Sequence, residues 1–202
     1  MKFIVESQFF APISVYSGLV QEGTVILLEH CENYQKRSFR NKCLIATANG
    51  VQSLIVPLES GKNAQQSIRD VKIANVERWQ LRHWQAIRSA YGKSPYFEHY
   101  AAVLDPFFAK KYTFLFDMNM EILNNTLKWL KCENKIDFTT EFNADFSNDR
   151  GILDMRNRFR KEKDLEGNRR YPQVFEDRFG FTDGLSVLDL LFCMGPSARQ
   201  YL

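Results

Sequence analysis

The chain is organised around Tyr34-Gln35-Lys36-Arg37-Ser38-Phe39-Arg40-Asn41-Lys42, nine residues between two apolar runs. Four of the nine are cationic, and four more carry uncharged hydrogen-bonding groups. The flanking runs, residues 24–30 and 44–47, are mostly aliphatic and predict strands. Because loops held by rigid elements often carry binding groups, this basic connection (residues 34–42) is a candidate ligand-binding segment. A solvated basic loop is the alternative.

Further strands are predicted on both sides of the basic connection. Asn49-Gly50 favours a tight turn, and therefore a hairpin. The run that starts at Lys2 meets Glu6 after three apolar residues. A secretory segment needs roughly 7–15 uninterrupted apolar residues, so this run is a first strand. Strands are predicted over residues 2–8, 24–30, 44–47, 52–58, 135–140 and, as an edge strand, 67–73; residues 12–19 form a short helix or turn.

Three helices are predicted in the middle of the chain, over residues 75–91, 95–108 and 111–131. The third keeps an alternating four-three apolar spacing, which is typical of an amphipathic helix. Asn75 is the expected cap of the first helix. Near the end of the chain, Ser186 precedes Asp189 by three residues, which predicts a capping box and a short final helix.

This order of elements predicts a mixed α/β fold: N-terminal strands and a hairpin packed by three central helices, with a short C-terminal helix. A length of 202 residues suits one domain, 1–202. The polar segment 145–170 predicts a long mobile loop inside it, and whether this loop closes over a ligand is left open.

Composition excludes several function classes. The net charge of +3, from 27 basic and 24 acidic residues, is too balanced for a nucleic-acid binder that relies on overall charge. No apolar run approaches the ~18 residues of a membrane span. The four cysteines are scattered and form no C-x-x-C pair, which is typical of free thiols. We therefore predict a cytoplasmic protein whose oligomeric state the sequence leaves open.

No cofactor or metal motif is complete. Gly92-Lys93-Ser94 would need a glycine five residues before Gly92 to form a phosphate loop, and Ile87 stands there. Metal ligation by Glu29, His30, Glu32 and His83 would require a contact that local spacing does not indicate. Hence no cofactor and no metal are predicted.

Two histidines are the candidate catalytic residues. His83 falls on the inner face of the first central helix, where a hydrogen-bonded core histidine is the alternative. His30 lies at a strand end, where binding residues of open α/β sheets collect; a plain strand terminus is the alternative. Imidazole titrates near neutral pH, so either residue can act as a general acid or base.

The ligand expected from these residues is a small anion or a sugar derivative. Two or three donors suffice to bind a diphosphate or carboxylate. Aromatic side chains can stack on a sugar or a base, although helix packing is the alternative. Single-stranded nucleic acid is less favoured because the basic stretch is brief. The candidate ligand-binding residues are Tyr34, Lys36, Arg37, Ser38, Arg40, Asn41, Tyr91 and Tyr96.

Three ordered blocks resemble the WbqC-like protein family, in its Bacteroidetes-type branch. The first is residues 33–42 with Gly50 and Leu54-Ile55-Val56-Pro57; the second runs from Trp79 to Phe97. The third is Leu185-Ser186-Val187-Leu188-Asp189-Leu190-Leu191-Phe192 with Gly195-Pro196. One departure is the opening Ser7-Gln8-Phe9-Phe10-Ala11-Pro12, where many members have Gln-Pro-x-Tyr-Phe-Pro.

The resemblance implies a role in bacterial surface-polysaccharide (O-antigen) biosynthesis, with a suggested glycine or other acyl transfer to sugars. It supplies no catalytic residues, so the candidates above come from residue chemistry alone. The altered opening implies a different substrate if that segment touches it. A non-catalytic sugar-nucleotide-binding or scaffold protein is the alternative.

Overall fold

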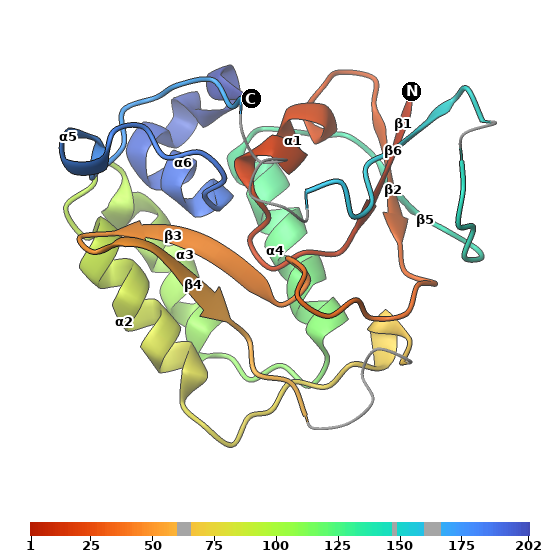
Figure 1. The fold of residues 1–202 in the computed structure, drawn as a ribbon, viewed down its shortest axis with the longest axis horizontal. Coiled ribbons are helices and arrows are strands. Elements are labelled where there is room, and N and C mark those ends of the chain that lie inside the picture. Colours follow the sequence, from red (N-terminus) through yellow and green to blue (C-terminus); the bar gives the residue numbers. More distant parts are fainter. Residues whose placement is uncertain (60–65, 147–148, 160–166) are drawn as a thin grey trace.

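Four short parallel strands form the main sheet, in the order β5-β2-β1-β6. They are β1 (Lys2–Glu6), β2 (Val25–Glu29), β5 (Ile136–Phe138) and β6 (Ile152–Asp154). The computed structural model describes residues 1–59, 66–146, 149–159 and 167–202. Figure 1 shows this sheet beside a helical layer, so the predicted α/β class is confirmed.

The predicted hairpin is also confirmed. Strands β3 (Lys42–Thr47) and β4 (Gly50–Ile55) pair antiparallel, with Thr47 opposite Gly50. Gly50 has a φ of 100°, which glycine adopts without steric cost. The hairpin is a sheet of its own, so the basic connection joins two separate sheets.

The three predicted central helices are present with shifted starts: α2 (Trp79–Tyr91), α3 (Phe97–Ala109) and α4 (Leu115–Trp129). Asn75 does not cap α2, because its amide donates to the Tyr112 carbonyl at 2.8 Å. The start of α4 is delayed because the residues before it pair with residues 71–73; Lys72 forms a bridge with Phe114.

Two segments differ from the pattern-based prediction. The predicted edge strand at 67–73 instead contains a 3-10 turn, Ile68–Asp70, where the Ser67 hydroxyl accepts from the Arg69 N–H. The predicted loop at 145–170 contains β6, which pairs with β1 in the sheet. Polar composition concealed this strand; residues 147–148 and 160–166 of the segment lie outside the described residues.

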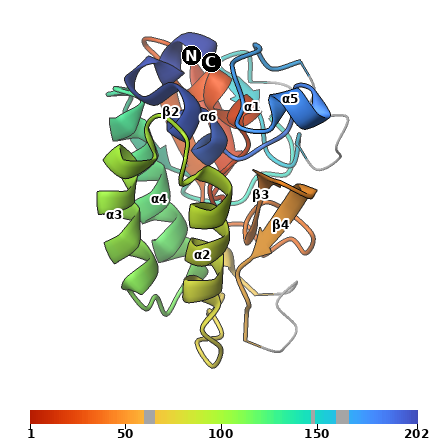
Figure 2. The ribbon, with the colours of Figure 1, turned by 90° about the vertical axis from the view of Figure 1, so that its left-hand side faces the viewer.

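Aromatic rings hold the helices together. Trp84 of α2 stacks on Phe97 and Phe108 of α3, with ring centroids 5.8 and 5.6 Å apart. Phe192 of α6 (Val187–Met194) lies 5.1 Å from the Tyr91 ring. Figure 2 shows α2, α3 and α4 together on one side, with the hairpin next to α2.

The remaining short helices flank the sheet and the C-terminal end. Helix α1 (Ile13–Leu19) approaches β1 so closely that a Cβ at Gly18 would lie 2.5 Å from the Phe3 ring. Helix α5 (Glu176–Phe179) and a 3-10 segment, Gly195–Tyr201, complete the chain. No helix among the described residues is long and apolar enough to cross a membrane.

Ser186 caps α6 as predicted, since its hydroxyl accepts from the Leu188 N–H at 3.2 Å. Asp189 does not complete a capping box; it is fully buried and accepts a hydrogen bond from Tyr171. Replacing an N-cap serine by alanine costs about 1 kcal/mol. We therefore expect Ser186→Ala to lower the free energy of unfolding by about 1 kcal/mol in urea denaturation. Ser89→Ala, on the exposed face of α2, is the control; an equal loss there would contradict the capping role.

Candidate functional site

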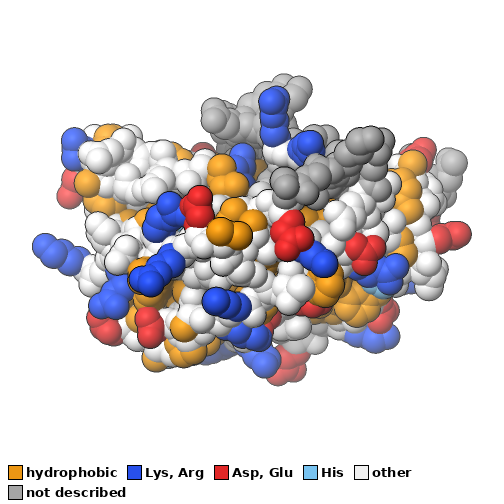
Figure 3. Space-filling model, turned by 90° about the horizontal axis from the view of Figure 1, so that it is seen from below, with side chains coloured by type: hydrophobic (Ala, Val, Ile, Leu, Met, Phe, Trp, Pro, Cys, Tyr) orange, Lys and Arg blue, Asp and Glu red, His pale blue; other side chains and the backbone are white. Residues whose placement is uncertain are grey.

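The carboxyl ends of the four parallel strands bring charged residues to one edge of the sheet. Strands β1, β2 and β6 end at Glu6, Glu29 and Asp154. In open parallel sheets, ligands bind at this edge. In Figure 1 the strands point downward, so Figure 3 shows the face beyond their ends, where basic, acidic and apolar side chains are mixed. The carboxyl edge is defined here as Glu6, Ser7, Gln8, Glu29, His30, Glu32, Thr139, Asp154, Arg156 and Asn157.

Arg40 is the centre of one buried ion network at this edge. Its guanidinium donates to both carboxylate oxygens of Glu32, at 2.7 and 2.5 Å. It also donates to Asn157 Oδ1 at 3.2 Å and lies 3.7 Å from Glu6. Burial acts to lower the pKa of Arg40, but Glu32 and Glu6 outweigh it and hold the pKa above its usual value. Arg40 is therefore a charged residue with no exposed surface.

Arg156 is the centre of a second network. It donates to Glu29 at 2.8 Å and to Asp154 at 2.7 Å. The rings of Phe142 and Phe146 lie 5.5 and 5.0 Å from its guanidinium, within the range of cation–π attraction. The two networks place two arginines among four carboxylates.

Two buried polar atoms at this edge have no partner among the described residues: Ser7 Oγ and Gln8 Oε1. A cavity of about 10 Å³ touches both residues, which is room for roughly one water molecule. Buried polar groups are otherwise nearly always hydrogen-bonded. Six other buried side-chain atoms in the described part of the chain also lack a partner, so these two atoms do not by themselves mark a ligand site.

Backbone strain also collects after the strand ends. Four non-glycine residues in the described part of the chain have a positive φ. Three of them follow β1, β2 and β6: Phe10 at 41°, Arg37 at 56° and Asn157 at 56°. Such conformations cost of order 1–3 kcal/mol and cluster at functional sites.

His30 lies at the carboxyl edge and is half-buried. Its Nε2 lies 2.6 Å from the Thr139 carbonyl oxygen, which can only accept, so Nε2 carries the proton. In the neutral ring, Nδ1 is then the acceptor nitrogen. The Phe138 ring, 5.2 Å away and 44% exposed, lies beside it. This geometry suits a general base with an aromatic neighbour.

His83 is buried among aromatic rings. Its ring lies 5.1 Å from Trp79 and 6.0 Å from Phe9. Burial lowers its pKa to about 4, although a hydrogen bond with the Ile55 backbone acts in the opposite direction. Its proton-transfer role stays a prediction, and the burial favours the packed core histidine that was the alternative.

The basic connection divides into buried and exposed residues. The Tyr34 hydroxyl donates to Asn41, whose amide donates to the Val56 carbonyl. Ser38 donates to the Gln35 carbonyl and is buried. These contacts, with the buried Arg40, fix the connection's shape. Only two of its candidate ligand-binding residues are exposed, Lys36 and Arg37.

The two tyrosines predicted to bind a sugar lie elsewhere. Tyr91 is fully buried, and its hydroxyl accepts from the Ala46 N–H at 2.9 Å. Tyr96 is 36% exposed and packs against Gly195, at the end of α6. The structure therefore does not bring them to the carboxyl edge, and their ligand contact stays a prediction.

Sequence reasoning considered Glu29 and Glu32 only as metal ligands, and it missed Glu6, Asp154 and Arg156. Glu6 and Glu29 each end an apolar run, and that position is a signal a reader of the sequence can use. Arg156 follows a polar segment and gives no such signal. Among the described residues, no three His, Cys, Asp or Glu side chains are arranged to hold a metal ion. All four cysteines are free thiols, as predicted.

Comparison with known proteins identifies the family of this chain. A model of the WbqC-like protein family matches residues 8–169, which is most of the chain. The chain belongs to the WbqC-like protein family. An uncharacterised protein, Rv1507c of Mycobacterium tuberculosis, is 26% identical over 98% of this chain and 96% of its own length. No solved structure matches. The matched WbqC-like range includes β2, β5 and β6, so most of the carboxyl edge lies in it.

Proposed function

We propose that this protein is a cytoplasmic transferase that moves a glycyl or other acyl group onto an activated sugar in bacterial surface-polysaccharide (O-antigen) biosynthesis. Membership of the WbqC-like family is compatible with a role related to polysaccharide biosynthesis. The observation that carries the proposal is the carboxyl edge, where His30 lies beside two buried ion networks.

The proposed reaction uses His30 as the base. The acceptor's amine or hydroxyl attacks the carbonyl carbon of the acyl donor, and His30 Nδ1 takes its proton. The donor's leaving group departs with the electron pair of the broken acyl bond. The exposed Phe138 ring offers an apolar face to the sugar ring.

Lys36 and Arg37 bind the anionic part of the ligand in this proposal. Both are exposed, and they extend from a connection that buried contacts hold in shape. Arg40 is a positioning residue: it ties that connection to Glu6 of β1 and Asn157 after β6. A rigid loop that presents free cations suits a diphosphate or a carboxylate.

A thermal-shift screen tests the binding part. Nucleotide sugars, glycyl derivatives and acyl-CoA are compared with short single-stranded DNA and RNA. A ligand at 100 times its dissociation constant stabilises the folded state by roughly 2.7 kcal/mol, which the screen detects. We expect a shift with a sugar nucleotide or an acyl donor. A shift with nucleic acid alone would contradict the transferase.

Two variants then test the residues. The double variant Lys36→Ala/Arg37→Ala should lower the affinity for the ligand at least about tenfold, since one hydrogen bond to a charged group contributes about 1.5–3 kcal/mol. Lys93→Ala/Lys128→Ala removes the same charge from exposed positions elsewhere and should leave affinity unchanged. His30→Gln should abolish turnover with binding retained. Binding without turnover in the parent protein would favour the non-catalytic sugar-nucleotide binder.

A further inference from the structure

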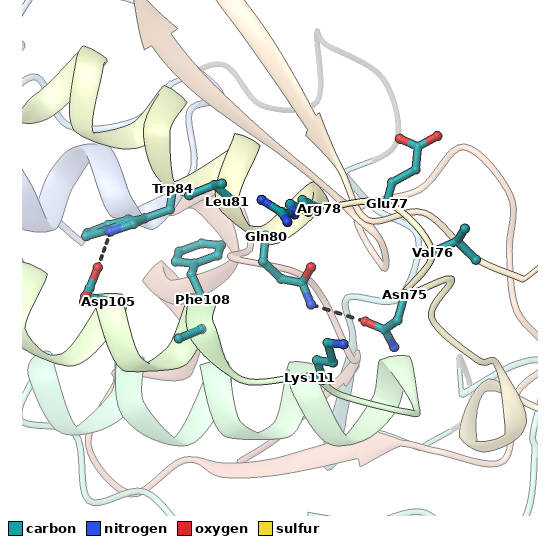
Figure 4. Close-up of a pocket in the computed structure, with 11 residues that line it drawn as sticks. Asn75, Val76, Glu77, Arg78, Gln80, Leu81, Trp84, Asp105, Phe108 and Lys111 are labelled. Atoms are coloured by element: carbon teal, nitrogen blue, oxygen red, sulfur yellow. Dashed lines mark hydrogen bonds between the residues drawn. The ribbon is translucent and has the colours of Figure 1, made fainter.

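A cavity of about 460 Å³ opens between the start of α2 and the end of α3, apart from the carboxyl edge. Cavities that hold small ligands are typically about 300–1,000 Å³. Figure 4 shows Trp84, Phe108 and Leu81 along one part of it, with Lys111 and Asn75 toward the other end. Neither membership of the WbqC-like family nor the proposed reaction gives this cavity a role.

The apolar part of the cavity is fixed in place. Trp84 stacks between Phe97 and Phe108, and its indole N–H donates to Asp105 at 2.6 Å. Leu81 is 46% exposed and adds an apolar wall. Rigid apolar walls of this kind bind a ring with little ordering cost.

Two cations line the other part. Arg78 and Lys111 are both exposed, and no carboxylate lies within ion-pair distance of either among the described residues. Their neighbours differ: Arg82 pairs with Glu77, and Lys110 pairs with Glu121 at 2.5 Å. Arg78 and Lys111 therefore line the cavity as unpaired cations, whereas the adjacent Arg82 and Lys110 are each paired with a carboxylate.

Two neutral amides also line this part of the cavity. Gln80 donates to Asn75 Oδ1 at 3.2 Å, which holds both amides at the cavity wall. Helix α2 starts here without a side-chain cap. Glu77, just before that start, also lines the cavity, and its carboxylate is paired with Arg82. Asp105, the one carboxylate near the apolar floor, already accepts from Trp84.

We propose that this cavity binds a small molecule in which an apolar ring carries a phosphate or carboxylate group. The ring lies against Leu81 and the edges of Trp84 and Phe108, and the anion lies between Arg78 and Lys111. This ligand is separate from the one proposed for the carboxyl edge.

Phenyl phosphate is the probe, followed by the indole N–H resonance of Trp84 in ¹⁵N-labelled protein. Trp84→Phe identifies that resonance by its loss. We expect a saturable shift, and ~10-fold weaker binding in Arg78→Gln and in Lys111→Gln, since each loses a charge-assisted hydrogen bond. Phenol and inorganic phosphate alone should each bind more weakly.

The neighbouring Lys110 is the matched control. Lys110→Gln removes one charge next to Lys111 at a residue that does not line the cavity, and we expect unchanged affinity. Equal weakening in this control would show a general charge effect and overturn the proposal, as would no saturable shift at millimolar probe. Lys36→Ala/Arg37→Ala should not affect phenyl phosphate, so a failure here is separate from a failure at the carboxyl edge.

Discussion

Arg40→Met should destabilise the protein by about 3–5 kcal/mol, the usual cost of breaking a buried ion pair. The substitution leaves Glu32, which is 2% exposed, without its bidentate partner. Glu6 and Asn157 lose a contact as well. The measurement is urea denaturation at neutral pH, followed by circular dichroism.

A second substitution separates the two causes of this loss. Arg40→Met/Glu32→Leu removes both charges, and replacing a buried pair by apolar groups is often nearly neutral. We therefore expect the double variant to regain part of the stability. Lys36→Met is the control, since that side chain is exposed on the same connection. A loss below about 1 kcal/mol in Arg40→Met, the level of an exposed pair, would contradict the buried network.

Asp189→Asn should change how stability depends on pH. Burial raises the pKa of Asp189 to about 6, and hydrogen bonds from Tyr171, Tyr91 and Gln173 only partly offset that rise. Because the folded-state pKa lies above the ordinary value of 3.8, Asp189 favours the folded state below pH 4 and loses that contribution as pH rises through 6. A pKa of about 6 in place of 3.8 corresponds to a full contribution of about 3 kcal/mol.

The difference in unfolding free energy between the parent and Asp189→Asn isolates this group. Measured from pH 4 to pH 7, it should move by about 2 kcal/mol in favour of the asparagine variant. His83, with a lowered pKa of about 4, contributes to stability in the opposite direction, since it favours the folded state above pH 6.5. This contribution is the same in both proteins, so it cancels in the difference. Parallel curves for the two proteins would contradict a buried, raised carboxyl. Asp177→Asn, on the short helix α5, is the control.

At the carboxyl edge, residue types alone predicted part of the site but not which of its side chains are buried. Arg40 is recognisable as a cation on a connection between strands, which predicted a ligand contact. Its burial depends on Glu6 and Asn157, which are distant in the chain and arrive only when β1 and β6 pair. The sign of a charge is visible in a sequence, but its solvent exposure depends on such partners.

By itself the sequence determined the elements whose cause is local: the β3–β4 hairpin with Gly50, the serine cap of α6 and the three central helices, whose periodicity and turn residues act over a few positions. Only the tertiary structure decided that β6 completes the sheet, that Asp189 is buried beside Tyr171, and that Lys36 and Arg37 stay exposed while Arg40 does not. These outcomes rest on contacts between segments far apart in the chain, and no local pattern encodes which segments will meet.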